Sequence, residues 1–176
     1  DMAFVDPEYR ESAMAIDQAK YGRLPDLITN GDMLGVVHNH STYSDGLHTL
    51  KEMSDYTRDN GFQYLVMSDH SKAAFYADGL KEDQVEAQWA EIDQINASYV
   101  DGFRVYKGIE ADILNDGSMD YGNDFLSQFE VVVASIHSQL NMDLEKANRR
   151  LIKAIENPHT HILGHITGRL LLSRAG

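Results

Sequence analysis

The run LGVVHNHSTYSDG at residues 34–46 decides the fold prediction for this chain. Its apolar start is typical of a short buried strand, and His38 and His40 follow at the end of that strand. Side chains two positions apart on an extended chain point to the same side, so both imidazoles are expected to face one ion. Asp45, in the following turn, offers an oxygen ligand. A lone His-x-His can also be two polar residues that close a strand, so the rest of the chain must decide.

The composition is that of one domain without disulfides or membrane spans. The chain has 176 residues, of which 43% are hydrophobic, enough for a buried core. It contains no cysteine, so a metal must be held by histidine and carboxylate side chains, a donor set that suits zinc, manganese or iron. No apolar run approaches the roughly 20 residues of a membrane span, and no signal-peptide pattern is present, which predicts a cytoplasmic protein.

The charge balance is strongly acidic, with 28 acidic and 15 basic residues and a formal net charge of −13. Such a surface repels a polyanion, which argues against an extensive nucleic-acid interface. It still allows one strand end to enter a metal-filled pocket. All eight histidines follow residue 37, so the chemistry is expected in the later part of the chain.

Apolar runs and capping signals predict an alternation of strands and helices after the first strand. Further strands are predicted at residues 64–67, 103–109, 129–136 and 161–163. Helices are predicted over about 49–60, 80–99 and 143–156. Residues 1–33 are predicted to be a linker or helical arm, with a helix from about residue 7 to 22 that begins at Asp6-Pro7.

Each predicted strand is followed by a histidine or an acidic residue. The four later strands lead into Asp69-His70, Glu110 and Asp112, His137, and His165. In barrels of alternating strands and helices, active sites lie at the carboxyl ends of the strands. Five strands that all end in metal-type residues are hard to explain by chance, so the sequence predicts a metal site at this edge.

The candidate ligands have structural alternatives that the sequence leaves open. His70, His137 and His165 are interpreted as ligands, whereas His48, His159 and His161 are not. Glu110 is expected to bridge two ions, although it could be a buried ion-pair partner of Arg104 or Lys107. Asp69 is expected to cap or orient an imidazole, and it is also a candidate for proton transfer. Arg169 could bind a phosphate oxygen or form a structural salt bridge.

Six short motifs together resemble the polymerase-and-histidinol-phosphatase (PHP) family. They are His38-Asn-His40, Ser44-Asp45-Gly46, Ser68-Asp69-His70, Gly108-Ile-Glu110, Ser135-Ile-His137 and Leu163-Gly-His165. The resemblance covers residues 34–176. Leu24-Pro25 and the runs at 131–137 and 162–169 are most similar to the carboxyl-terminal domain of bacterial family-X DNA polymerases.

The resemblance implies a distorted seven-stranded (β/α) barrel that holds two or three divalent ions (Mn²⁺, Zn²⁺ or Fe²⁺). The residues at family ligand positions are His38, His40, Asp45, His70, Glu110, His137 and His165. It also implies hydrolysis of phosphate esters by a metal-activated water. In family-X polymerases this domain is associated with 3′–5′ exonuclease and DNA-end repair activity, so a DNA 3′ end and an attached polymerase part are the expected partners.

Three departures from the family pattern affect this expectation. Val36 stands where the family often has Asp, and Ile166 stands where the polymerase group has Pro. The family pattern also closes with an Asp-x-His that this chain does not reach before Gly176. A PHP domain incomplete at its carboxyl end is therefore expected. The alternatives are a stand-alone small-molecule phosphatase, which would ignore DNA ends, and a degenerate metal-binding or structural module, which would not hydrolyse esters.

Overall fold

The computed structural model describes residues 2–168, and the chain divides into two compact units, Asp1–Met33 and Leu34–Gly176. The first unit holds the 3₁₀ turns η1 (Pro7–Tyr9) and η2 (Asn30–Asp32) and the short helix α1 (Ala15–Lys20). The single helix predicted over residues 7–22 is therefore wrong. Helix α1 buries only Ala15 and Ala19 and leaves Ile16 exposed, so little apolar packing supports a longer helix.

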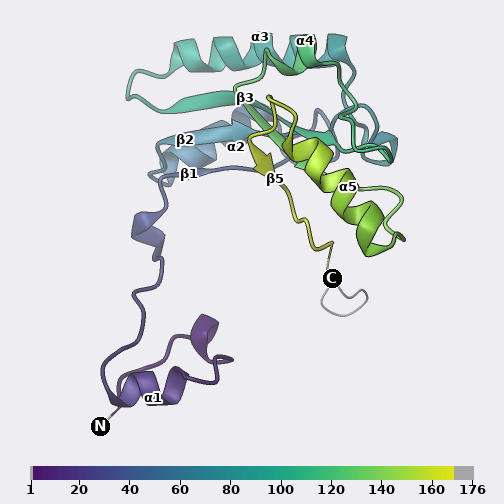
Figure 1. Cartoon of the computed structure of the whole chain (residues 1–176). Helices are drawn as coiled ribbons and strands as arrows, with labels where there is room; N and C mark the ends of the chain where they lie inside the picture. Colours follow the sequence, from purple (N-terminus) through teal and green to yellow (C-terminus); the bar gives the residue numbers. More distant parts are fainter. Residues whose placement is uncertain (1, 169–176) are drawn as a thin grey trace. The chain divides into compact units, whose positions relative to one another are not determined.

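The second unit is built on a five-stranded parallel sheet in the order β1-β2-β3-β4-β5. The strands are β1 (Gly35–Val36), β2 (Tyr64–Met67), β3 (Arg104–Asp112), β4 (Val131–Ser135) and β5 (Ile162–Leu163). The sheet curls into a half-barrel with helices packed on it (Figure 1). The predicted α/β fold class, a (β/α) barrel of PHP type, is confirmed to this extent.

The helices follow the strands as the capping signals predict. They are α2 (Leu50–Asp59), the 3₁₀ turn η3 (Phe75–Ala77), α3 (Glu82–Ser98), α4 (Asn123–Leu126) and α5 (Leu144–Ile155). Thr49 caps α2 and Asp143 caps α5, each by accepting a hydrogen bond from a backbone N–H of the first turn. The sequence did not indicate α4. Among residues 2–168, no helix combines the length and the apolar character needed to cross a membrane.

Strand β3 separates the core from the candidate site. Its odd-numbered residues Ile109 and Ala111 are fully buried in a hydrophobic cluster with residues of β4, α3 and α4. Its even-numbered residues Glu110 and Asp112 point to the opposite face, because side chains alternate along a strand. The strand runs three residues further than predicted, so both carboxylates lie within β3, paired in register with Val133 and Ser135.

Gly108 allows β3 to lie close to β2. A Cβ atom at this position would lie 2.4 Å from the backbone oxygen of Met67 and 2.7 Å from Cγ1 of Val66. We expect Gly108→Ala to lower the free energy of unfolding by about 1–3 kcal/mol, since backbone must move to admit the methyl group. Urea denaturation followed by circular dichroism measures the loss.

Gly122→Ala is the matched control, because a Cβ atom at Gly122 meets nothing within 4 Å. It is expected to cost less than about 1 kcal/mol, as an N-cap substitution at α4. Equal losses in the free energy of unfolding for the two variants would show that the close approach of β3 to β2 does not require glycine at position 108.

Candidate metal centre

Five imidazoles surround the carboxylate of Glu110, whose side chain is only 1% exposed. Three imidazoles approach one carboxylate oxygen, Oε1: Nε2 of His38 at 2.9 Å, Nε2 of His165 at 2.9 Å and Nε2 of His137 at 3.1 Å. Two approach the other oxygen, Oε2: Nδ1 of His70 at 3.1 Å and Nε2 of His40 at 3.5 Å. We call these five imidazoles together with Glu110 and Asp45 the histidine cluster.

The turn after β1, rather than a continuing strand, brings His38 and His40 together. Strand β1 ends at Val36, and His38 adopts a left-handed backbone conformation with φ of 65°. The expectation that both side chains share one side of an extended strand is therefore wrong, although both still reach Glu110. The side-chain amide of Asn39 donates to the backbone oxygen of Val66 at 2.8 Å and ties this turn to β2.

Three overlapping groups of this cluster have the geometry of metal sites. They are His38, His40 and Glu110; His40, Asp45 and His70; and His70, Glu110 and His137. Within each group the potential ligand atoms lie within 4.8 Å of one another. All seven residues predicted as ligands are thus brought together, His165 through its contact with Glu110. Their role as ligands stays a prediction.

The donor atoms are placed where divalent ions could bind, and hydrogen bonds do not satisfy all of them. His40 Nδ1, His70 Nδ1 and Glu110 Oε2 are buried and have no hydrogen-bond partner. Nitrogen-to-oxygen separations of 2.9–3.1 Å match two ligands of one ion, whose bonds are about 2.0–2.2 Å.

The alternative in which Glu110 pairs with a basic side chain of β3 is wrong. Arg104 pairs with Glu130, and Lys107 pairs with Asp93. Both of these pairs lie on the exposed surface, away from the buried carboxylate of Glu110. The surroundings of Glu110 are therefore imidazoles, with no lysine or arginine in contact among the described residues.

Asp112 orients His137, a role that the sequence did not reveal. Its Oδ1 lies 2.6 Å from Nδ1 of His137, which leaves Nε2 facing Glu110. Burial lowers the pKa of His137, but the hydrogen bonds with Asp112 and Glu110 outweigh it and raise the pKa to about 9. Burial instead dominates at His70, whose pKa is lowered. Burial also raises the pKa of Glu110, but hydrogen bonds from His137, His38 and Ser135 lower it well below its usual range.

Asp69 precedes His70 in the segment that follows β2. It is fully buried, and its carboxylate accepts four hydrogen bonds: from the backbone N–H and the hydroxyl of Ser41, from the hydroxyl of Ser44, and from the amide of Gln88. These bonds hold the turn that carries His40 and Asp45. None of these bonds involves an imidazole, so Asp69 positions the turn and does not orient a histidine ring through them. A part of Asp69 in proton transfer stays a prediction.

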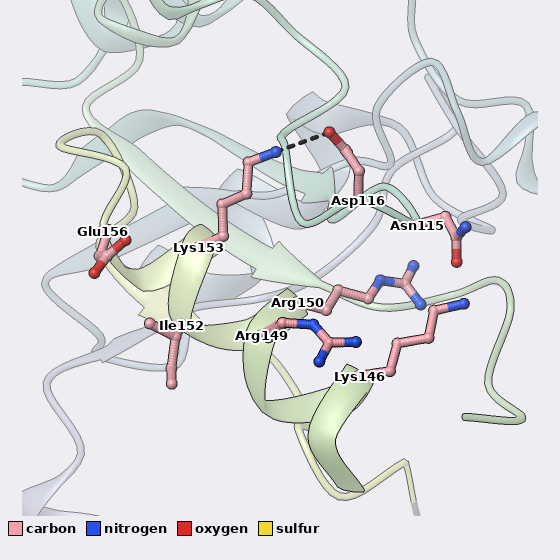
Figure 2. Close-up of a pocket in the computed structure, with 8 residues that line it drawn as sticks. All are labelled: Asn115, Asp116, Lys146, Arg149, Arg150, Ile152, Lys153 and Glu156. Carbon is pink, nitrogen blue, oxygen red and sulfur yellow. Dashed lines mark hydrogen bonds and ion pairs between the residues drawn. The ribbon is translucent and has the colours of Figure 1, made fainter. Parts of the chain in front are cut away.

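A buried arginine fastens the two loops that follow Asp112 and His137. Arg150 of α5 is 1% exposed, and its guanidinium donates to four backbone oxygens, those of Ile113 (2.6 Å), Leu114 (2.8 Å), Ser138 (3.0 Å) and Gln139 (3.4 Å). Figure 2 shows Arg150 beside a cavity of about 540 Å³ that is lined by α5 and by the loop after β3, where Lys153 pairs with Asp116 at 2.8 Å. No residue of the histidine cluster lines that cavity.

The remaining candidate residues stand apart from the cluster. His48 is exposed, and Nδ1 of His161 accepts a hydrogen bond from the backbone N–H of Val132 at 3.1 Å, between β4 and β5. His159 lies in the loop after α5. Arg169, predicted to contact phosphate, lies outside the described residues.

The half-barrel and the histidine-rich carboxyl edge of its sheet define an α/β protein with a candidate metal centre. No family model matches the chain. The chain is, however, 39% identical over 175 residues, 99% of its length, to the DNA polymerase/3′–5′ exonuclease PolX of Bacillus subtilis (strain 168). It is also 27% identical over 136 residues, 73% of its length, to a probable phosphatase of Thermoanaerobacter sp. (strain X514).

These similarities confirm the predicted resemblance to PHP proteins and, among them, to the bacterial family-X polymerases. The chain spans 30% of the length of PolX and 51% of that of the phosphatase.

The position of Arg150 leads to a prediction about stability. Arg150→Met keeps the apolar stem but removes the guanidinium donor from four backbone oxygens, of which that of Leu114 keeps a bond from the N–H of Gly117. We therefore expect the free energy of unfolding to fall by about 3 kcal/mol. Denaturation followed by the fluorescence of Trp89, the single tryptophan of the chain, measures this change. The control is Arg149→Met, which removes an exposed pair with Glu145 and is expected to change stability by less than about 0.5 kcal/mol. A loss equal to that of the control would contradict the assigned role.

Proposed function

We propose that this chain is the metal-dependent phosphoesterase domain of a family-X DNA polymerase and acts as a 3′–5′ exonuclease at DNA ends. The observation that carries the proposal is the convergence of five imidazoles on the buried carboxylate of Glu110 at the carboxyl edge of the sheet. The similarity to PolX over 99% of the chain supports the DNA substrate, because the similarity to a phosphatase covers less, 73%.

Two or three divalent ions, of manganese, zinc or iron, would be held by the histidine cluster. Glu110 offers one oxygen to each of two neighbouring groups of imidazoles, which suits a bridging carboxylate. Ions bound there would neutralise the phosphate charge and lower the pKa of a coordinated water toward neutrality. They would also make the pocket locally positive in a chain whose formal net charge is −13.

The other residues of the site position these ligands. With an ion bound, Asp112 would accept the Nδ1 proton of His137 and so leave Nε2 to act as the ligand atom. Asp69 fixes Ser41 and Ser44, and with them the turn from His40 to Asp45. Arg150 holds the loops beyond Asp112 and His137. We extend the proposal to a cytoplasmic protein in which a polymerase part is attached to this domain.

Metal content is the first test of the proposal. Elemental analysis of chain purified without a chelator is expected to find at least two manganese, zinc or iron ions per chain. The double variant His38→Ala/His40→Ala should lose at least one of these ions, because it removes two of the three donors of one candidate group and one donor of a second. His48→Ala, which removes an exposed imidazole outside the cluster, is the control and should keep the full metal content. Less than one ion per unmodified chain would contradict the proposal.

Hydrolysis is the second test. With manganese added, the chain should shorten a 5′-labelled single-stranded oligonucleotide from its 3′ end, and the His38→Ala/His40→Ala variant should be at least about 100-fold slower, since it loses metal ligands. A phosphate monoester such as p-nitrophenyl phosphate, assayed in parallel, distinguishes an exonuclease from a small-molecule phosphatase. Hydrolysis at the unmodified rate in the His38→Ala/His40→Ala variant would contradict the metal-dependent mechanism.

A further inference from the structure

Two neighbouring aromatic side chains lie exposed beside the histidine cluster. Phe75 is 84% exposed and Tyr76 is 59% exposed, and both belong to η3 in the connection between β2 and α3. Among the aromatic residues described from Leu34 onward, only Tyr56 on α2 is comparably exposed, at 73%. An exposed pair of large aromatic rings next to the histidine cluster indicates a surface that contacts a ligand.

The two rings extend outward from the predicted metal ligands. The ring centroid of Tyr76 lies 6.3 Å from that of His70 and 6.4 Å from that of His137. The ring of Phe75 follows at 6.0 Å from that of Tyr76, with the two planes at 78°. An aromatic surface therefore begins at the edge of the histidine cluster and continues away from it, with its outer ring the more exposed one.

The connection that carries the rings is anchored, so their exposure is built into the fold. The backbone N–H of Leu80 donates to the oxygen of His70 at 2.8 Å and closes the base of the loop. Ala74 and Ala77, on either side of the two rings, are buried, and the N–H of Ala77 donates to the oxygen of Ala74 at 2.9 Å. The backbone that carries the rings is thus held in place, which reduces the entropy lost when a ligand binds.

We propose that Phe75 and Tyr76 form a stacking platform for the bases at the end of a single nucleic-acid strand whose phosphate enters the histidine cluster. This rests on the proposed phosphoesterase function and assigns its substrate class. A base is joined to its phosphate through one sugar, so a ring next to the metal ligands is within reach of the terminal base. Base–aromatic stacking tolerates any sequence and requires no positive charge, which suits an exonuclease on a chain of net charge −13.

A small-molecule phosphate ester would not explain the second ring. The histidine cluster alone can hold a phosphate group, and Tyr76 alone borders it, whereas Phe75 lies one ring further out. A protein interface is also less well supported, since a stable one occupies roughly 20–30 residues a side and the aromatic surface has two.

The test uses a terminal base that reports stacking by its own fluorescence. The probe is a twelve-residue oligothymidylate with 2-aminopurine at its 3′ end and a phosphorothioate last linkage to prevent cleavage. We expect the chain loaded with manganese to quench the 2-aminopurine fluorescence. We also expect it to bind this probe at least about fivefold more tightly than the same oligonucleotide with an abasic 3′ end, the lower range of one base–aromatic contact.

The variant Phe75→Leu/Tyr76→Leu should abolish the quenching and bind the two oligonucleotides equally. Both side chains are exposed, so the variant is expected to keep its fold by circular dichroism and its metal content. Tyr56→Leu is the matched control, because it removes an equally exposed ring on α2 and should leave quenching and affinity unchanged. Unchanged quenching in the double variant would overturn the platform.

The remaining outcomes separate this inference from the proposed function. If the unmodified chain binds metal and hydrolyses the monoester but does not quench the probe, the platform is wrong and the phosphoesterase stands. If it neither binds metal nor hydrolyses any ester, both proposals fail. Sedimentation tests a third outcome. If the unmodified chain self-associates, the Phe75→Leu/Tyr76→Leu variant does not, and the two quench the probe equally, the rings form a contact between copies instead.

Discussion

The carboxylate of Glu110 is the constraint on which the second unit depends. A carboxylate with 1% of its side chain exposed is costly to bury unless charged or hydrogen-bonding groups surround it. Here the surrounding groups are imidazoles that come from the carboxyl ends of the other four strands, so each strand must end where its histidine can reach β3. The parallel order β1 to β5 places β3 at the centre, so the other four strand ends all lie near Glu110.

Local backbone strain gathers around the same carboxylate. The non-glycine residues with positive φ among those described are His38, Asp78, Gln139 and His165. Two are members of the histidine cluster, and Gln139 and Asp78 lie in loops just beyond His137 and Tyr76. Left-handed backbone is unfavourable for such residues and persists where the surrounding structure enforces it. Buried anchors such as Arg150 and Asp69 supply that enforcement through several hydrogen bonds each.

The sequence was sufficient for the fold class because its signals are local. Apolar runs and caps such as Thr49 and Asp143 located the strands and helices within a few residues, and the chemistry at each strand end identified the residues that converge. The sequence did not predict features that depend on contacts between elements. On α5, helical spacing alone predicts that the apolar Leu144 and Ile155 face the core, but both are exposed and Arg150 is buried. Which stripe of a helix is covered depends on the loops packed against it, which no helical period records.

The acidic charge of the chain and a DNA substrate are compatible only if affinity comes from few, short-range contacts. Proteins that bind nucleic acid along its phosphate backbone use many cationic side chains, and their binding releases counterions. Among residues 2–168, most exposed basic side chains are paired with carboxylates, as Lys153 is with Asp116 and Arg104 with Glu130, so they offer little free positive charge. Divalent ions at the histidine cluster and uncharged stacking on Phe75 and Tyr76 would act on the last nucleotides alone. A site of that kind favours a strand end over a long duplex, which is the selectivity that an exonuclease requires.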